Sequence, residues 1–461
     1  AFLERTGIAN FFISFANRLT GWSSGGPAKV AVISSALCGM VSGSSVGNTV
    51  TTGSFTIPMM KKTGYKPEFA GAVEAAASTG GQIMPPIMGA AAFLMAEYIG
   101  IPYAKVAVKA ILPAILYFTG GIFISVHLEA KKLGLRGIPR DQLPKWGLLA
   151  RDCYLILPLI LLVWLVSSGA KTMSHSAAYS ILAAIVVGLV NFFLTRMRSA
   201  EEKSAKTTVR AIGGALADSG RSAVDSLEAG AKGAITVAVA CAMAGIIAGC
   251  ITVTGLASIL INAIVQLAGN ATFIGLILTM VCCIILGMGV PTTANYCIMA
   301  STCAPILIKM GYPLVAAHFF VFYFGIVADI TPPVALAAYA GSAIAKSNPM
   351  KTGINATKLA IAAFIVPFIF AYNPQMLFEN VTSVFQVVQI VITALLGIFA
   401  VAAGLEGYIL RKMGWPLRVL AVIGGLTLLI PGTVSDLIGL VIVAGIIALQ
   451  LLQNKRERSE V

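Results

Sequence analysis

Two short clusters of hydroxyl, amide and glycine residues interrupt long apolar stretches of this chain. They occupy residues 43–49 and 287–295, and each ends near an asparagine, Asn48 or Asn295. Glycines and hydroxyl side chains disfavour a continuous helix, so backbone carbonyl groups there are expected to lack helical partners. Free carbonyls combined with Ser, Thr and Asn oxygens suit a hard cation such as sodium. The spacing therefore predicts two cation sites within apolar sequence.

A proline pair follows each cluster and completes the predicted cages. Residues 67–79 run into a pair at 85–86, and residues 313–327 run into a pair at 332–333. Two consecutive prolines remove two amide donors, which frees carbonyl groups one turn earlier. We expect these carbonyls to join the side-chain oxygens in two cages, the first formed by Ser45, Asn48, Gly80 and Gly81 and the second by Thr292, Asn295 and Ala328.

Helix amino termini are expected to face the same clusters. The helices that leave them are predicted to begin just after Asn48 and Asn295, which directs free N–H groups and positive dipole ends toward the cluster. Such ends favour an anion, so a carboxylate substrate is expected between the two clusters. The hydroxyl groups expected to contact this substrate belong to Ser44, Thr49, Thr293 and Thr331.

Two acids lie in the middle of apolar segments, where a charged side chain is costly and usually functional. Asp329 follows Ala328 at the second helix break and is interpreted as a cation ligand, a proton carrier or an N-cap of the next half-helix. Glu74 precedes Gly80 within the same apolar stretch and is a second candidate for ion or proton coupling. No cofactor is predicted beyond a transported Na⁺ or H⁺.

Both clusters belong to one pattern that the chain contains twice. At a single gap-free offset of 247 residues, Asn48 aligns with Asn295, Lys62 with Lys309, and one proline pair with the other. Broken apolar segments at matching positions in two halves are typical of the central site of a secondary transporter. Each cluster is therefore predicted to be the tip of a re-entrant helical hairpin, because backbone polar groups in lipid must be paired or must line protein or water.

Composition predicts an all-α polytopic membrane protein. Of the 461 residues, 58% are hydrophobic and 11% are charged. If successive predicted spans cross the membrane in alternating directions, 28 of the 32 Lys and Arg fall on one side, and the exceptions are Lys105, Lys109, Lys171 and Lys309. Basic loops are typically cytoplasmic, so this side is predicted to face the cytoplasm. The net charge of +14 therefore needs no nucleic-acid partner. Five spans separate the hairpins, an odd number, so the two repeats are expected to be inverted.

The predicted organisation is two inverted repeats, a scaffold between them, and further spans at the end. The first repeat is 1–127, with a hairpin at 28–60, a broken helix at 67–99 and a scaffold helix at 104–127. Residues 128–253 supply scaffold spans and a cytoplasmic amphipathic arm at 195–232. The second repeat is 254–371, with a hairpin at 275–309, a broken helix at 313–345 and a scaffold helix at 354–371, and residues 372–461 add spans divided near Pro431.

The remaining reactive side chains form no catalytic or metal-binding pattern. The eight Cys fall in apolar segments without zinc-ligand spacing, and His318 is expected to make a hydrogen-bonded contact between helices. The acids and His do not pair as nucleophile and base, and no GxxxxGK[ST] nucleotide loop is present. The chain is therefore not expected to be an enzyme.

Several motifs resemble the large membrane subunit of tripartite ATP-independent periplasmic (TRAP) transporters. They are GGPAKVAV at 25–32, SGSSVGNTVTTGSFTIPMM at 42–60, the proline-broken helices, and LEAGAKGA at 227–234. The similarity covers residues 1–371 and is greatest to the branch that uses TAXI-type binding proteins, whose small and large membrane parts are commonly fused.

The resemblance implies an elevator-type transporter, similar in fold to the ion-transporter superfamily, in a bacterial or archaeal inner membrane. Its implied partners are a periplasmic TAXI-type substrate-binding protein and a small four-helix membrane subunit, carried by another chain or by residues before Ala1. The implied activity is ion-driven uptake of a small organic acid, a carboxylate or dicarboxylate. Many large subunits carry an acid in each hairpin tip, where Asn48 and Val290 stand here. This departure weakens the inference of sodium coupling and leaves Asp329 as a candidate proton carrier.

Two other kinds of transport protein stay open. A single-component, ion-coupled anion or dicarboxylate carrier would need no binding protein, and a neighbouring gene for a soluble periplasmic protein would separate the two. A channel would conduct without saturation, whereas a carrier saturates and counterflows.

Overall fold

The computed structural model describes residues 2–169, 171–199, 205–269, 271–381, 383–430 and 432–459. Within these ranges the chain is helical, without a β-strand. Seven helical segments there are long and apolar enough to cross a membrane: Tyr103–Lys132, Arg140–Ser168, Met173–Thr195, Ala217–Val253, Pro349–Tyr372, Val384–Glu406 and Thr433–Gln453. The prediction of an all-α, multi-pass membrane protein is therefore confirmed.

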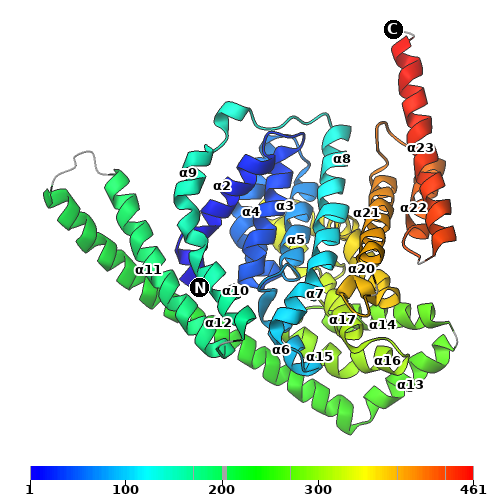
Figure 1. Ribbon diagram of the computed structural model, residues 1–461, viewed down its shortest axis with the longest axis horizontal. Coiled ribbons are helices and arrows are strands. Elements are labelled where there is room, and N and C mark those ends of the chain that lie inside the picture. Colours follow the sequence, from blue (N-terminus) through cyan, green and yellow to red (C-terminus); the bar gives the residue numbers. More distant parts are fainter. Residues whose placement is uncertain are drawn as a thin grey trace.

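The first helices pack side by side in the upper part of Figure 1. Helices α1 (Phe2–Arg5) and α2 (Ile8–Thr20) lead into α3 (Gly26–Ser42) and α4 (Ser45–Lys62), which form a hairpin. The turn between them needs a left-handed residue, and Gly43 has φ 64°. The following elements are α5 (Pro67–Gly81), α6 (Gly89–Ile99) and a rod made of α7 (Tyr103–Ile115), η1 (Leu116–Phe123) and α8 (Ile124–Lys132).

The middle of the chain forms short and long helices, of which α11 and α12 run along the periphery (Figure 1). They are η2 (Arg140–Gln142), α9 (Trp146–Asp152), η3 (Cys153–Ile156), α10 (Leu157–Ser168), α11 (Met173–Ser199) and α12 (Ala205–Val253). The amphipathic arm expected at 195–232 falls on the end of α11 and the first part of α12, and its position at the cytoplasmic interface stays a prediction. Helix α11 continues to Ser199, and α12 runs without interruption through the predicted span, because no proline occurs between residues 205 and 253. Residues 200–204 of that arm lie outside the described residues.

Helix α12 packs against the second half of the chain through small side chains. Ala240 and Ala244 lie against Ala294 and Ile298 of α15 (Thr292–Thr302). Much of the rest of α12 is exposed, including Ile246 at 60% and Val253 at 90%. A helix with such an apolar exposed surface is suited to lipid or to a partner helix.

The second group of helices comprises α13 (Leu256–Ala268), α14 (Thr272–Gly287), α15, α16 (Ala304–Lys309), α17 (Leu314–Val327), η4 (Ala328–Ile330), α18 (Leu336–Ala345), α19 (Pro349–Leu359), α20 (Ile361–Tyr372) and η5 (Pro374–Leu377). Helices α13 to α17 lie in the lower part of Figure 1, whereas α18 and α19 of the same half pack against α5.

The helix boundaries recur at the sequence offset of 247 residues. Helices α4, α5 and α6 begin at Ser45, Pro67 and Gly89, and α15, α17 and α18 begin 247 residues later in each case. The left-handed non-glycine residues Met88 (φ 58°) and Ala335 (φ 33°) are related by the same offset. The opposite orientation of the two copies in a membrane stays a prediction.

Two helices that are buried along most of their length, α5 and α17, form the centre of the molecule. Every side chain from Phe69 to Gly81 and from Val315 to Val327 is buried, as expected for helices without a polar face. Glycines let α5 approach its neighbours closely. A Cβ atom on Gly341 of α18 would lie 2.6 Å from the carbonyl oxygen of Gly71, so the two halves of the chain touch backbone to backbone here.

The last spans are α21 (Val384–Glu406), α22 (Trp415–Thr427) and α23 (Thr433–Ser459). Helix α22 ends shortly before the Pro431-Gly432 position and α23 begins just after it, at the division expected from the sequence. Helices α21 and α22 cross closely at Gly397 and Gly425, which have no side chains to separate the two backbones. A Cβ atom on Gly425 would lie 2.6 Å from the Gly397 carbonyl oxygen.

Candidate functional site

The tip of the first hairpin is shorter than predicted. Only Gly43 and Ser44 are non-helical, and α4 begins at Ser45, so Asn48 lies inside the helix rather than before it. Ser44 explains the earlier start, because its Oγ accepts the Gly47 N–H at 3.2 Å and caps the helix. In the second hairpin α15 begins at Thr292, so Asn295 is also helical. The expectation that these helices begin after the asparagines is therefore wrong.

Ser45 joins the first tip to the second half of the chain. Its Oγ donates to Asp329 Oδ2 at 2.6 Å, across 284 residues of sequence. Both side chains are buried, at 2% and 6% exposure. Asp329 lies in η4, the short turn that ends the buried helix α17. The hairpin tip of one half thus contacts the helix break of the other half.

The two asparagines make matching contacts. Asn48 Nδ2 donates to Ser78 Oγ on α5 and to the Ser35 carbonyl on α3, both at 3.0 Å. Asn295 Nδ2 donates to the carbonyl of Gly325 on α17 at 2.9 Å. Ser78 and Gly325 are themselves 247 residues apart. In each half, an asparagine therefore ties the hairpin to the broken helix at the same place.

The carbonyl groups predicted to be free are already bonded. The Gly80 carbonyl accepts the Ile83 N–H at 3.0 Å, the Gly81 carbonyl accepts the Met84 N–H at 3.1 Å, and the Ala328 carbonyl accepts the Thr331 N–H at 3.4 Å. The reason is that the backbone after α5 and after α17 makes a tight, hydrogen-bonded turn before each proline pair. Each oxygen keeps a second lone pair, so it can still serve as a ligand.

Gly80 and Gly81 are required by packing at the first break. A Cβ atom on Gly80 would lie 2.1 Å from Tyr117 Cε1, and one on Gly81 would lie 2.6 Å from the Gly39 Cα. Tyr117 belongs to η1 and donates to the Ala76 carbonyl at 2.7 Å. These glycines allow α5 to contact both the hairpin and the rod formed by α7, η1 and α8.

Unpaired polar atoms gather at the same breaks. Among the described residues, Thr79 Oγ1, both side-chain polar atoms of Gln82, and Asn295 Oδ1 are buried without a hydrogen-bond partner. Buried polar groups are usually satisfied, so these oxygens are suited to a cation or a water. Thr79 and Gln82 were not predicted from the sequence. Gln82 aligns with Asp329 at the offset of 247 residues, a signal that could have identified it.

The predicted substrate hydroxyls have varied surroundings. Ser44 is exposed and Thr293 is half-buried, as is its neighbour Thr292 of the predicted second cage. Thr49 is buried and donates to the Ser45 carbonyl at 2.8 Å. Thr331 is half-buried and donates to the Val327 carbonyl at 2.8 Å. Within the described chain, Ser44 is thus the most accessible of the four hydroxyls.

Two other predicted positions lie near the hairpins. Glu74 is fully buried on α5 and is surrounded by hydroxyl groups of α3, α4 and α5. His318 contacts Tyr296, with 2.7 Å between Nδ1 and the phenol oxygen. The interpretation of His318 as a hydrogen-bonded contact between helices is therefore confirmed.

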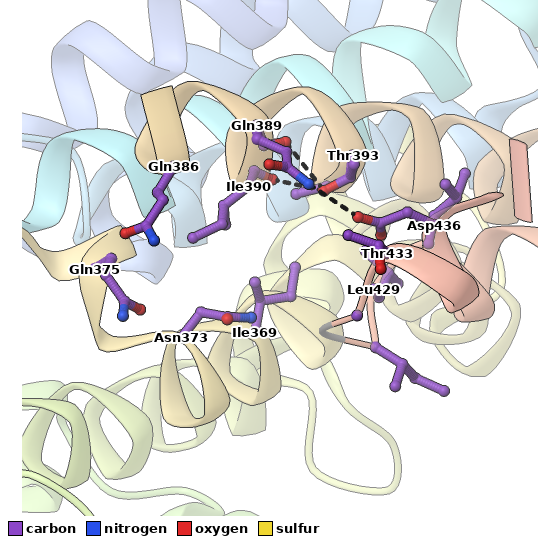
Figure 2. Close-up of a pocket in the computed structure, with 14 residues that line it drawn as sticks. Ile369, Asn373, Gln375, Gln386, Gln389, Ile390, Thr393, Leu429, Thr433 and Asp436 are labelled. Atoms are coloured by element: carbon purple, nitrogen blue, oxygen red, sulfur yellow. Dashed lines mark hydrogen bonds between the residues drawn. The ribbon is translucent and has the colours of Figure 1, made fainter. Parts of the chain in front are cut away.

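A separate cavity of about 240 Å³, lined by both polar and apolar side chains, lies beside the last spans. Figure 2 shows the amide side chains of Asn373, Gln375 and Gln386 around it, and the hydrogen bond from Gln389 Nε2 to Asp436 Oδ2 at 3.3 Å. Its lining comes from α20, η5, α21 and the ends of α22 and α23, so it is distinct from the hairpin tips.

Comparison with known proteins shows a match to one family of transporter components. Residues 1–381 match the family model described as the tripartite ATP-independent periplasmic transporter, DctM component. The large permease protein DctM of a C4-dicarboxylate TRAP transporter from Vibrio cholerae is 28% identical over 147 residues, which is 32% of this chain and 31% of that protein.

Two further curated proteins are similar to this chain. The large permease protein SiaM of a sialic acid TRAP transporter from Vibrio cholerae is 25% identical over 191 residues, or 41% of this chain and 44% of that protein. The uncharacterized protein y4mL of Sinorhizobium fredii is 29% identical over 172 residues, or 36% of this chain and 40% of that protein. The chain thus spans less than half the length of the curated relatives that it matches.

Proposed function

This chain belongs to the DctM family of tripartite ATP-independent periplasmic transporter components, a family of transporter subunits rather than enzymes, and from that premise we propose that it is the large permease of an ion-coupled secondary transporter. It takes up a small organic acid, a carboxylate or dicarboxylate, across a bacterial inner membrane. The observation that carries this proposal is the Ser45–Asp329 hydrogen bond, which joins the hairpin tip of one half to the helix break of the other. Such a meeting point between two halves is where secondary transporters hold substrate and ion.

The coupling ion is Na⁺ or H⁺, held beside the tips. Support for a cation comes from the oxygen-rich surroundings of Asn48 and Asn295, and from the unpaired Asn295 Oδ1. Oxygen atoms of side-chain amides, hydroxyls and backbone carbonyls are the ligands that hard cations prefer. Asp329 adds a carboxylate to the same region. The cation therefore binds between the α15 tip, η4 and the first hairpin.

A carboxylate is favoured as substrate by the amino termini of α4 and α15. Both helices begin at a hairpin tip, at Ser45 and Thr292, and helix amino termini favour anions. One relative is named for C4-dicarboxylates and another for sialic acid, which is also a carboxylic acid. Ser44 is exposed at this tip, so its hydroxyl is proposed to contact the carboxylate.

The proposed mechanism is an elevator movement. The hairpins and broken helices, from α3 to α6 and from α14 to α18, form the transport part. The rod of α7, η1 and α8, together with α10, α11, α12, α20 and α21, forms most of the scaffold. Support comes from the glycine contacts within the transport part, such as Gly71 with Gly341, because a unit that moves as one body needs tight internal packing.

The proposed partners are a periplasmic substrate-binding protein of the TAXI type and a small four-helix membrane subunit. The family description names a tripartite, periplasmic system, and the exposed apolar surfaces of α11, α12 and α23 offer faces on which membrane helices can pack.

Uptake into liposomes tests the proposal. The full chain is reconstituted with its small subunit and cognate binding protein, and a panel of radiolabelled small carboxylates is offered under an imposed Na⁺ or H⁺ gradient. Saturable accumulation that requires one gradient and the binding protein is expected. Accumulation without the binding protein would identify a single-component carrier, and non-saturating flux would identify a channel.

A further inference from the structure

Glu74 lies in a closed cage of hydroxyl groups on the first half of the chain. Its Oε1 accepts from Ser35 Oγ at 2.5 Å and from Ser78 Oγ at 3.3 Å, and also from Thr52 Oγ1. Its Oε2 accepts from Thr56 Oγ1. The carboxyl group thus has one donor from α3, two from α4 and one from α5.

No charged partner balances this carboxyl group. The elements α3, α4, α18, α19, η1 and η4 pack against α5. In the described chain, none of their charged or titratable side chains is among the interaction partners of Glu74. These side chains are Lys29, Cys38, Lys61, Lys62, Tyr117, Asp329, Tyr339, Lys351 and Lys358. Glu74 is 0% exposed, so an ionised form there is stabilised by hydroxyl groups alone.

The hydroxyl groups of the cage have a second set of acceptors. Thr52 Oγ1 lies 2.7 Å from the Asn48 carbonyl, and Thr56 Oγ1 lies 3.1 Å from the Thr52 carbonyl. Ser35 Oγ and Thr52 Oγ1 are 3.0 Å apart, and either can donate to the other. Each of these hydroxyls can therefore turn its proton toward the carboxylate or away from it, while the heavy atoms stay in place.

This arrangement suits both forms of the side chain. When Glu74 is ionised, all four hydroxyls can donate to it, three to Oε1 and one to Oε2, and a carboxylate accepts without needing a proton of its own. When Glu74 is protonated, its own O–H donates to one hydroxyl and the threonines donate to their helix carbonyls. Neither form leaves a buried polar group without a partner.

We propose that Glu74 is a reversible proton-binding site, at which a proton from bulk water adds to one carboxylate oxygen and is later returned to water. The site is separate from the cation region at the hairpin tips. It reaches the first tip through Ser78, which accepts from Asn48 and donates to Glu74. A role of Glu74 in making H⁺ a coupling ion rests on the proposed function. The binding of a proton to Glu74 does not rest on it.

Infrared spectroscopy of the purified full chain in lipid nanodiscs tests the site without any substrate. The spectrum reports the carbonyl stretch of protonated carboxylic acids, and slow exchange in D₂O selects those that are buried. The unmodified chain should show a slowly exchanging band that disappears as pH rises, and Glu74→Gln should lose it. Glu228→Gln is the matched control, since Glu228 is exposed on α12 and pairs with Lys232 at 2.5 Å, and it should keep the band.

A second variant keeps the test valid if Glu74→Gln fails to fold. Thr56→Val removes one cage donor at nearly constant volume and should shift the pH midpoint of the band. Thr51→Val should leave the midpoint unchanged, because Thr51 is exposed and donates to the Gly47 carbonyl. Asp329 is also buried, so the readout is the part of the band that differs between the unmodified chain and Glu74→Gln. A band of unchanged intensity in Glu74→Gln, a difference that does not depend on pH, or an unmoved midpoint in Thr56→Val would overturn the assignment. A failure of the uptake assay would leave this result unaffected.

Discussion

Removal of the Ser45 hydroxyl should loosen the contact between the two halves of the site. Ser45 Oγ and Asp329 Oδ2 are 2.6 Å apart, a distance typical of a hydroxyl that donates to an ionised carboxylate. A hydrogen bond to a charged group contributes about 1.5–3 kcal/mol. Since both residues are buried, water does not readily replace the lost donor. We expect Ser45→Ala to lower the free energy of unfolding by about 1.5–3 kcal/mol.

A double-mutant cycle with Asp329→Asn isolates this interaction. Denaturant titration of the four proteins in detergent micelles, followed by tryptophan fluorescence, gives the free energy of unfolding for each. The coupling between the two substitutions should be about 0.5–3 kcal/mol, the range for residues in direct contact. Thr51→Ala, an exposed hydroxyl on the same helix, should change stability by less than about 0.5 kcal/mol. Additive effects of Ser45→Ala and Asp329→Asn would refute the reasoning.

Three further predictions concern the hairpins and the ion. Asn48→Ala and Asn295→Ala should each abolish uptake in liposomes while the protein still elutes as a folded species; full activity of both variants would remove the asparagines from the cation site. Gly81→Ala should destabilise the fold by about 1–3 kcal/mol through overpacking, because its Cβ would lie 2.6 Å from the Gly39 Cα, whereas Gly245→Ala has open space and should be neutral in thermal unfolding. Accumulation of substrate should follow either the Na⁺ or the H⁺ gradient when each is imposed alone, and equal uptake with neither gradient would exclude ion coupling.

The positions of the helix breaks could be predicted because they depend on local chemistry. Gly43 supplies the left-handed turn, and Pro291 lacks the amide hydrogen that a continuing helix would need. The division of the last spans beside Gly432 follows from the same kind of signal. The exact start of α4 at Ser45 was missed, because Ser44 acts as an N-cap only when the chain reverses direction there.

The site was predictable in its residue types and less so in its geometry. The asparagines at 48 and 295 were found through their repeat, and the structure gives them matching contacts with the broken helices. The hydrogen bond from the Ile83 N–H to the Gly80 carbonyl could not be predicted. A proline pair shows which amide hydrogens are missing, but it does not show which hydrogen bonds the preceding turn makes. The hydroxyl cage around Glu74 draws on three helices. Its members on α4 recur at i and i+4, but only tertiary packing brings Ser35 and Ser78 to the same carboxyl group.

The surface between α12 and α15 has a consequence for movement. A helix of 49 residues is about 74 Å long at 1.5 Å per residue, more than twice the thickness of a hydrocarbon core of about 30 Å. Where it passes α15 it presents alanines, which form no ridges deep enough to lock into grooves on a neighbouring helix. If α15 moves along α12 in the proposed elevator mechanism, these alanines offer little steric resistance, and a bulky side chain at Ala244 is expected to hinder the movement.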